Sequence, residues 1–176
     1  MNDKLVEITG TNNRYQIKKL KKESNAPKLR KASEKLGLSS EFFLIEKQSE
    51  LIDILYNNTV ITETPVLLSQ LDAKLSGYKH QDLLKKRYDE VAFIKITEVI
   101  TMLFNCELKC HYCNEKTFIL YDLARETKQW TLDRINNDLG HNSDNVIISC
   151  LECNLKRRRT GKDAFLFTKQ LNIIKS

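Results

Sequence analysis

Four of the five cysteines in this chain form two pairs with the same spacing, Cys110-His-Tyr-Cys113 and Cys150-Leu-Glu-Cys153. A gap of two residues lets both sulfur atoms of a pair reach one ion, so two pairs supply the four thiolates of a closed tetrahedral zinc site. Such a site ties two distant stretches of chain together and constrains the fold more than any other feature of the sequence. We predict a structural Zn²⁺ ion held by these four cysteines.

The alternatives to zinc are disulfide bonds and a redox dithiol. The N-terminus carries acidic residues and lacks the apolar core of a signal peptide, and no run approaches the roughly 18 apolar residues that span a bilayer. We therefore expect no membrane partner and an intracellular, reducing compartment, cytoplasmic or nuclear, where disulfides are rare. A redox dithiol needs only one pair, in a thioredoxin-like context that is missing. Cys106 is interpreted as a buried small apolar residue, and His111 as a fourth ligand is disfavoured because four cysteines are available.

The sequence divides into three parts. Residues 1–26 form a basic arm that we expect to be partly mobile, residues 27–105 are mostly helical, and residues 106–176 form a small zinc-bound domain. Helices are predicted over 28–36, from Ser39 or Ser40 to Tyr56, over 65–76 and 79–90 with Gly77 between them, and over 93–104. No pattern in this helical part indicates chemistry.

After Asn105 short β-prone runs replace the helical pattern. Strands are predicted within 117–121, 129–135 and 146–148, a helix from about Cys150 or Leu151, and a last helix from a capping box at 160–163. The 36 residues between the two cysteine pairs exceed the roughly 15–20 of a simple zinc ribbon, so the zinc holds a substantial insert. The predicted class is α+β, with a helical N-terminal part before a small zinc-bound domain.

The net charge of +6 is distributed unevenly along the chain. Residues 11–35 contain nine bases and two acids, residues 155–176 contain seven bases and one acid, and the middle, 36–154, is acidic. Basic ends of this kind favour a polyanionic partner, although a solvated lysine-rich helix face explains the N-terminal cluster equally well. One run of four bases is suited to phosphate: Lys156, Arg157, Arg158 and Arg159.

Two oxygen donors lie within and beside the insert. The pattern predicts a strand that ends at Asp133, a polar loop, and a second strand from Asn145, with Asn154 on the first turns of the helix that follows. Asp133 and Asn154 are then both suited to a hard divalent cation. Ordinary turn and cap roles are the alternative, but the position of the two residues relative to the zinc pairs favours the metal.

Together these residues resemble the HNH, or ββα-metal, nuclease family, in particular its zinc-bearing members. The resemblance covers about residues 106–170 and rests on the two cysteine pairs, Leu-Asp133, Gly140, Asn145-Val and Cys153-Asn154 with the bases after it. More loosely, the whole chain looks like HNH-type proteins of large DNA viruses, which adds a viral or phage origin to the expectations. The resemblance implies a ββα-metal fold in which Asp133 and Asn154 hold Mg²⁺ or Mn²⁺ against the scissile phosphate. Asn145 would fasten the loop by side-chain hydrogen bonds.

One position departs from the family pattern. The general-base histidine normally follows the metal-binding aspartate, and this chain has Arg134 there. A guanidinium stays protonated and cannot take a proton from water. Either His141, the only histidine of the loop, acts as the base, or Arg134 binds the phosphate while the metal activates the water, or the site only binds DNA. A structural role for His141, bonded to backbone, is equally compatible with the sequence.

The leading hypothesis is a zinc-stabilised HNH-type endonuclease that hydrolyses DNA phosphodiester bonds with a catalytic divalent metal. Its rival is a non-catalytic zinc-bound DNA-binding module with a degenerate HNH site. A protein-interaction zinc module of the RING or treble-clef kind is disfavoured by the cations after Asn154. We expect the basic flanks to contact duplex or branched DNA mainly through phosphates, and the helical part to position that DNA or to mediate homodimer formation.

Overall fold

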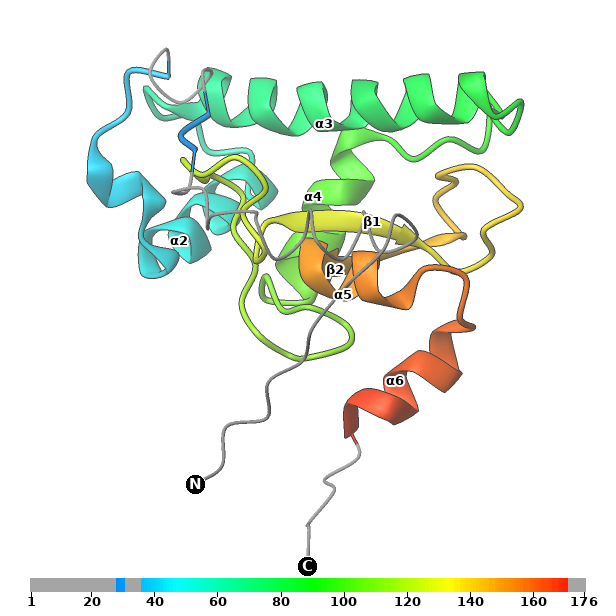
Figure 1. Cartoon of the computed structure of the whole chain (residues 1–176). Helices are drawn as coiled ribbons and strands as arrows, with labels where there is room; N and C mark the ends of the chain where they lie inside the picture. The colour runs from blue at the N-terminus through cyan, green and yellow to red at the C-terminus, as the bar shows by residue number, and fades with distance from the viewer. Residues whose placement is uncertain (1–27, 31–35, 171–176) are drawn as a thin grey trace, which may run out of the picture.

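The computed structural model describes residues 28–30 and 36–170 (Figure 1). The elements in chain order are a 3-10 helix η3 (Ser40–Phe43), helices α2 (Ile45–Tyr56), α3 (Thr64–Leu84) and α4 (Ile96–Asn105), strands β1 (Trp130–Arg134) and β2 (Val146–Cys150), and helices α5 (Leu151–Arg157) and α6 (Lys162–Gln170). Helices combined with a small two-stranded sheet confirm the α+β class. None of the helices in the described ranges is long and apolar enough to cross a membrane. The predicted arm, 1–26, lies outside the described residues.

Helix α3 is one continuous element where the sequence predicts two helices separated by Gly77. Its buried apolar side chains recur every three or four positions on one face: Leu67, Leu71, Leu75 and Tyr78. The roughly 1 kcal/mol that a glycine costs in a helix interior is small beside the burial of these side chains. The helix ends at Leu84, and Lys86 adopts a φ of 55°, so the predicted separate helix over 79–90 is wrong.

Two other predicted helices differ at their N-terminal ends. The helix expected from Ser39 or Ser40 is interrupted at Leu44, whose ψ of 141° is extended, so that η3 and α2 are separate. Of the helix expected over 28–36, residues 28–30 and 36 are described and are not helical, and Leu29 forms an isolated β-bridge with Leu123. Residues 31–35 lie outside the described ranges.

Strands β1 and β2 form an antiparallel hairpin in which Trp130 pairs with Cys150 and Asp133 pairs with Ile147. Side chains alternate along β1. Trp130 and Leu132 enter the main hydrophobic core, whereas Asp133 points to the opposite side, where it contacts α5. Helix α5 begins directly after β2, as the sequence predicts.

The β-prone run 117–121 forms one isolated bridge, from Phe118 to Gln129, rather than a named strand. The buried side chain of Gln48, on α2, takes the place of a neighbouring strand. Its amide oxygen accepts the N–H groups of Ile119 and Leu120 at 2.6 and 3.0 Å, and its nitrogen donates to the Leu120 carbonyl at 2.9 Å. Backbone groups that a strand would satisfy are thus satisfied by one glutamine.

One hydrophobic cluster includes residues from both sides of the predicted boundary at 105/106. It joins Leu67 and Leu71 of α3 to Trp130 and Leu132 of β1. Figure 1 shows α3 along one side of the molecule, with α4 and the hairpin beneath it. The helical part therefore packs directly on the hairpin, so its side chains can reach the loop between the strands.

Candidate metal centre and catalytic loop

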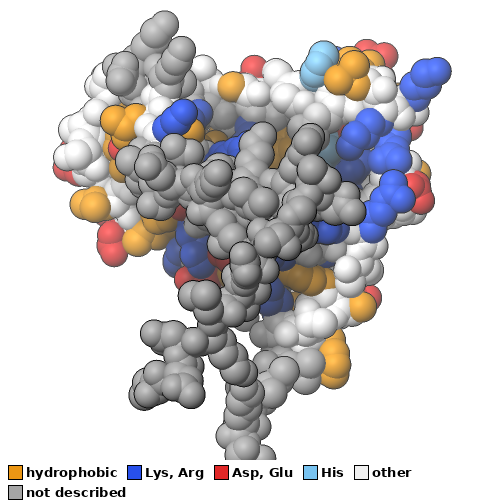
Figure 2. All heavy atoms as spheres, in the orientation of Figure 1, with side chains coloured by type: hydrophobic (Ala, Val, Ile, Leu, Met, Phe, Trp, Pro, Cys, Tyr) orange, Lys and Arg blue, Asp and Glu red, His pale blue; other side chains and the backbone are white. Residues whose placement is uncertain are grey.

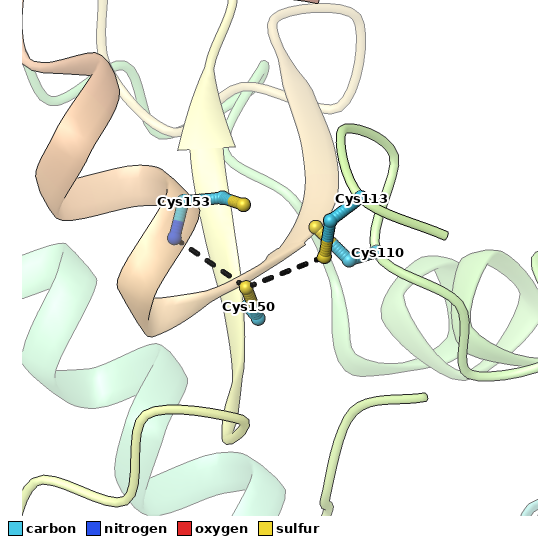
Figure 3. A group of neighbouring side chains, drawn as sticks. All are labelled: Cys110, Cys113, Cys150 and Cys153. Carbon is cyan, nitrogen blue, oxygen red and sulfur yellow. Dashed lines mark hydrogen bonds between the residues drawn. The ribbon is translucent and has the colours of Figure 1, made fainter. Parts of the chain in front are cut away.

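Four cysteine side chains converge where β2 meets α5 (Figure 3). The Sγ atoms of Cys110, Cys113, Cys150 and Cys153 all lie within 4.8 Å of one another. Around a tetrahedral zinc ion with bonds of about 2.3 Å, sulfur atoms stand about 3.8 Å apart, and the sulfurs of Cys113 and Cys150 are separated by 3.9 Å. That separation is far too long for a disulfide, and the cysteines are free. The predicted convergence is confirmed, and the cluster is compatible with a structural zinc site.

Hydrogen bonds among the thiols spread their pKa values apart. The hydrogen bond from Cys150 lowers the pKa of Cys110 to about 4, and the same bond, together with burial, raises the pKa of Cys150. Burial and then the charge of Cys110 raise the pKa of Cys153 to about 12. Ionisation of one thiol therefore opposes ionisation of the next, and a bound cation would offset this repulsion.

Backbone hydrogen bonds hold both cysteine pairs in position. The His111 N–H donates to the Ile148 carbonyl at 3.0 Å, which fastens the first pair to β2. Asn114 turns the chain after this pair with a φ of 57°. Cys150 is the N-cap of α5, and its Sγ accepts the Cys153 N–H at 3.4 Å. His111 itself is exposed and does not belong to the cluster.

Asp133 lies near the end of β1, as predicted, but its carboxylate is enclosed by partners. Arg157 of α5 donates from Nε to Oδ2 at 2.6 Å and from Nη2 to Oδ1 at 2.8 Å, and the Tyr112 hydroxyl donates to Oδ2 at 2.7 Å. Asp133 is 3% exposed and Arg157 is 1% exposed. Burial alone would lower the pKa of Arg157, but the hydrogen bonds and charge of the Asp133 carboxylate have the larger combined effect, and the pKa of Arg157 is raised. The three side chains form a closed cluster with no net charge.

A divalent cation does not fit Asp133 in this arrangement. Both carboxylate oxygens accept hydrogen bonds from a guanidinium that already compensates their charge. Asn154 stands on the same side of the hairpin, where its amide nitrogen donates to Thr131 Oγ1 at 3.1 Å and to the Leu132 carbonyl at 3.4 Å. The structure thus brings Asp133 and Asn154 to one side of the hairpin, with Arg157 in the place of a counter-ion.

His141 lies against α3, where Asp82 binds it twice. The ring Nδ1 lies 2.9 and 3.0 Å from the two carboxylate oxygens of Asp82, and the His141 backbone N–H donates to Oδ2 at 2.6 Å. The Tyr78 ring packs on the imidazole with 4.5 Å between centroids. Burial lowers the pKa of His141 more than the carboxylate raises it. The ring is therefore neutral at pH 7, and Nδ1 carries the proton that is donated to Asp82.

The second nitrogen of the imidazole remains open. Within residues 28–30 and 36–170, the one fully buried side-chain nitrogen or oxygen without a hydrogen-bond partner is Asn142 Oδ1. Nε2 of His141 has no hydrogen-bond partner there either, and it is not among the fully buried atoms, although the His141 side chain as a whole is only 5% exposed. An imidazole held at Nδ1 by a carboxylate and open at Nε2 is the tautomer that can accept a proton.

Arg134 points to the same side of β1 as Leu132 and lies close to the histidine. Its Nη1 donates to the Leu139 carbonyl at 3.1 Å. After burial, the charges of Arg134 and Lys85 also lower the pKa of His141. The hairpin therefore separates the predicted site residues into two groups. Arg134 and His141 lie on the side that faces α3, and the pair of predicted metal ligands lies on the other.

The side chain of Asn145 holds the two sides of the loop together by hydrogen bonds. Its Oδ1 accepts the Asn136 N–H at 2.9 Å, and its Nδ2 donates to the carbonyls of Asn136 and Gly140 at 3.0 and 2.9 Å. These are the loop-fastening hydrogen bonds that the family resemblance implied. Gly140 is required for a different reason, because a Cβ at this position would overlap the Arg87 carbonyl oxygen.

The basic run 156–159 does not form one surface. Arg157 is buried against Asp133, so its prediction as a surface phosphate contact is wrong. Lys156 pairs with Glu152 one turn earlier at 2.5 Å, and Arg158 and Arg159 are exposed. Lys156 and Arg157 lie on α5, where successive residues point about 100° apart. Arg158, with a φ of 52°, ends the helix, and Arg159 follows it.

No sequence motif indicated Asp82, Tyr78 or Tyr112, because each lies outside the strand–loop–helix pattern of the insert. One signal did exist for Asp82. It continues the buried stripe of α3, four residues after Tyr78, and a charged residue on an apolar stripe indicates a buried partner. The predicted break at Gly77 concealed this register.

Comparisons of the chain with protein-family models, with curated proteins and with solved structures found no match.

Proposed function

We propose that the protein is a zinc-stabilised endonuclease of the HNH type that hydrolyses phosphodiester bonds in DNA with His141 as the general base. The observation that supports this is the state of His141, a neutral imidazole bound at Nδ1 by Asp82 and open at Nε2. Because Arg134 occupies the usual position of the general base, several mechanisms were possible. The geometry favours the one in which His141 takes the proton, and Arg134 would then bind the phosphate. The four-cysteine cluster would hold Zn²⁺ as a structural ion.

In this mechanism each side chain has a separate task. Nε2 of His141 takes a proton from a water molecule as the water oxygen forms a bond to phosphorus. The bond from phosphorus to the leaving oxygen breaks, and that oxygen takes a proton from solvent. The guanidinium of Arg134 stabilises the negative charge that develops on the phosphate oxygens. Asp82 keeps the proton on Nδ1 and stabilises the imidazolium that forms.

The resemblance to the HNH family also implies Mg²⁺ or Mn²⁺ at Asp133 and Asn154. Because Arg157 supplies the positive charge at Asp133, the proposed mechanism assigns no step to a divalent cation. The same ion pair supports the second candidate function, a zinc-bound DNA-binding module without catalysis. In that case the Asp133–Arg157 pair is the remnant of a metal site, and His141 serves only to hold the loop on α3.

The decisive test is the cleavage of plasmid and four-way-junction DNA by the parent and by His141→Asn, with and without Mg²⁺ or Mn²⁺. The amide nitrogen of asparagine takes the place of Nδ1 and can still donate to Asp82, whereas the proton acceptor at Nε2 is lost. We expect the variant to retain its fold and zinc content and to cut about 100-fold or more slowly. His111→Asn, at an exposed histidine outside the loop, is the matched control and should cut like the parent.

Cutting by His141→Asn at the parent rate would show that His141 is not the base. If the parent binds DNA and cuts none of these substrates under any of the metal conditions, the binding module is the correct function.

A further inference from the structure

Exposed cations gather around the loop between β1 and β2. Figure 2 shows Lys and Arg side chains concentrated on the side of the molecule where this loop and the C-terminal end of α3 lie. We call the following residues the cationic rim: Lys85, Lys86 and Arg87 after α3, Arg134 at the end of β1, and Arg158 and Arg159 after α5. Four of the six are exposed and two are partly exposed.

Contacts with the loop place the rim on both of its sides. On the α3 side, Arg87 Nη1 donates to the Asn137 carbonyl, and Arg87 Nη2 lies 3.6 Å from Asp138. On the α5 side, Asn137 Nδ2 donates to the Arg158 carbonyl at 3.2 Å. Asn137 is therefore bonded to both sides, and the loop stands between two groups of cations.

The charge of the rim is largely uncompensated. The loop between β1 and β2 contains two acids, Asp138, which faces Arg87, and Asp144. The positive field reaches the base itself, because Arg134 and Lys85 both lower the pKa of His141. Six cations around a loop with two acids favour a polyanion over a neutral or acidic protein surface.

We infer that the cationic rim binds the two phosphate backbones of double-stranded DNA, with the loop facing the groove between them. Two groups of cations separated by a protruding loop match two strands separated by a groove, whereas a single strand would engage only one group. The inference rests on the proposed function, because it places one backbone next to His141. It also brings the end of α3, outside the segment that resembles HNH nucleases, into contact with substrate.

The test compares two double variants that remove the same charge. Lys85→Gln/Lys86→Gln neutralises the α3 side of the rim. Lys109→Gln/Lys116→Gln neutralises two exposed lysines near the cysteine cluster, at the opposite end of the hairpin. Affinity for a short labelled duplex and for one of its strands is measured by fluorescence anisotropy between about 50 and 200 mM salt, and gels verify that the DNA stays intact.

For the rim variant we expect about tenfold weaker duplex binding at low salt. The slope of log affinity against log salt should fall in magnitude by about 2, because each lost phosphate contact releases about 0.9 fewer counterions. The control variant should bind like the parent, and the parent should prefer duplex to single strand. Equal losses in both variants, equal affinity for single strand, or no duplex binding by the parent would overturn the inference. Plasmid cleavage by the parent, measured separately, shows whether the proposed function fails independently of this surface.

Discussion

The two ends of the β1–β2 hairpin are held by different kinds of interaction. At the end where Trp130 pairs with Cys150, four thiols converge within 4.8 Å and form a site for a metal ion. At the other end, where Arg134 pairs with Val146, the Asn145 side chain donates to the Gly140 carbonyl and the Asp82 carboxylate accepts the His141 N–H, and these bonds hold the loop. One end offers four thiols to an ion from solution, whereas the other is held by a helix more than fifty residues away in sequence.

Because of this difference, we expect the cysteine end to contribute to stability and the loop end to contribute to the proposed catalysis. The cysteine end joins the first cysteine pair to β2 and α5. The loop end holds a neutral imidazole whose Nε2 has no hydrogen-bond partner in the part of the chain that the structure describes, close to cations. Changes at the first end should therefore act mainly on folding, and changes at the second should act on catalysis with smaller effects on stability.

Loss of one cysteine of the cluster should have the largest effect. Cys150→Ser should abolish zinc binding and lower the free energy of unfolding by several kcal/mol, because the ion links two distant segments. Cys106→Ser is the control, since Cys106 is partly buried outside the cluster, and it should cost no more than about 1 kcal/mol. For each variant, mass spectrometry measures the zinc content and urea denaturation measures the free energy of unfolding. Equal losses of stability in Cys150→Ser and Cys106→Ser would contradict the idea that a metal ion stabilises this end of the hairpin.

Breaking the Asp133–Arg157 pair should have the next largest effect. Asp133→Asn leaves a buried guanidinium without its counter-charge and should cost about 3–5 kcal/mol in urea denaturation. The double variant Asp133→Asn/Arg157→Met removes both charges and should recover part of that loss. If Asp133→Asn is as stable as the parent, the pair does not hold the hairpin to α5, and a metal-binding role for Asp133 becomes the better interpretation.

Two glycine substitutions should act with opposite signs. Gly140→Ala places a Cβ against the Arg87 carbonyl oxygen and should destabilise by about 1–3 kcal/mol. Gly77→Ala adds a methyl group in open space within α3 and should stabilise by about 0.5–1 kcal/mol. Thermal unfolding reports both changes. A neutral Gly140→Ala would mean that the loop is not pressed against the end of α3.

The parts that could be predicted from sequence are those set by local pattern. The spacing of the cysteine pairs predicted the cluster, and alternation with β-branched residues predicted both strands and the helix after them. Gln48 shows the limit for strands, because a side chain from α2 satisfies the backbone of Ile119 and Leu120 where a strand was expected. A side chain that takes the place of a strand in this way depends on tertiary contact, and it leaves no pattern in the local sequence.

The candidate site was less predictable for the same reason. Asp82 becomes a site residue only because α3 continues past Gly77 and packs against the loop. Arg157 stands in a basic run that suggests a phosphate clamp, and only the helical phase turns it inward onto Asp133. In both cases the partner of the charged side chain is far away in sequence, so the spacing of nearby residues carries no information about it.

The pH dependence of DNA cleavage tests the central claim most directly. The base must be neutral, and burial holds the pKa of His141 below its ordinary value of 6.5 against the opposing effect of Asp82, with Arg134 and Lys85 lowering it further. For the parent, kcat/KM should rise with pH, reach half its plateau below pH 6.5, and be constant through neutrality. His141→Asn should lose most of the rate and should also lose this rise of kcat/KM with pH, the acidic limb of the profile. A limb that survives in His141→Asn, or a rate that still rises above pH 7, would contradict the assignment of His141 as the base.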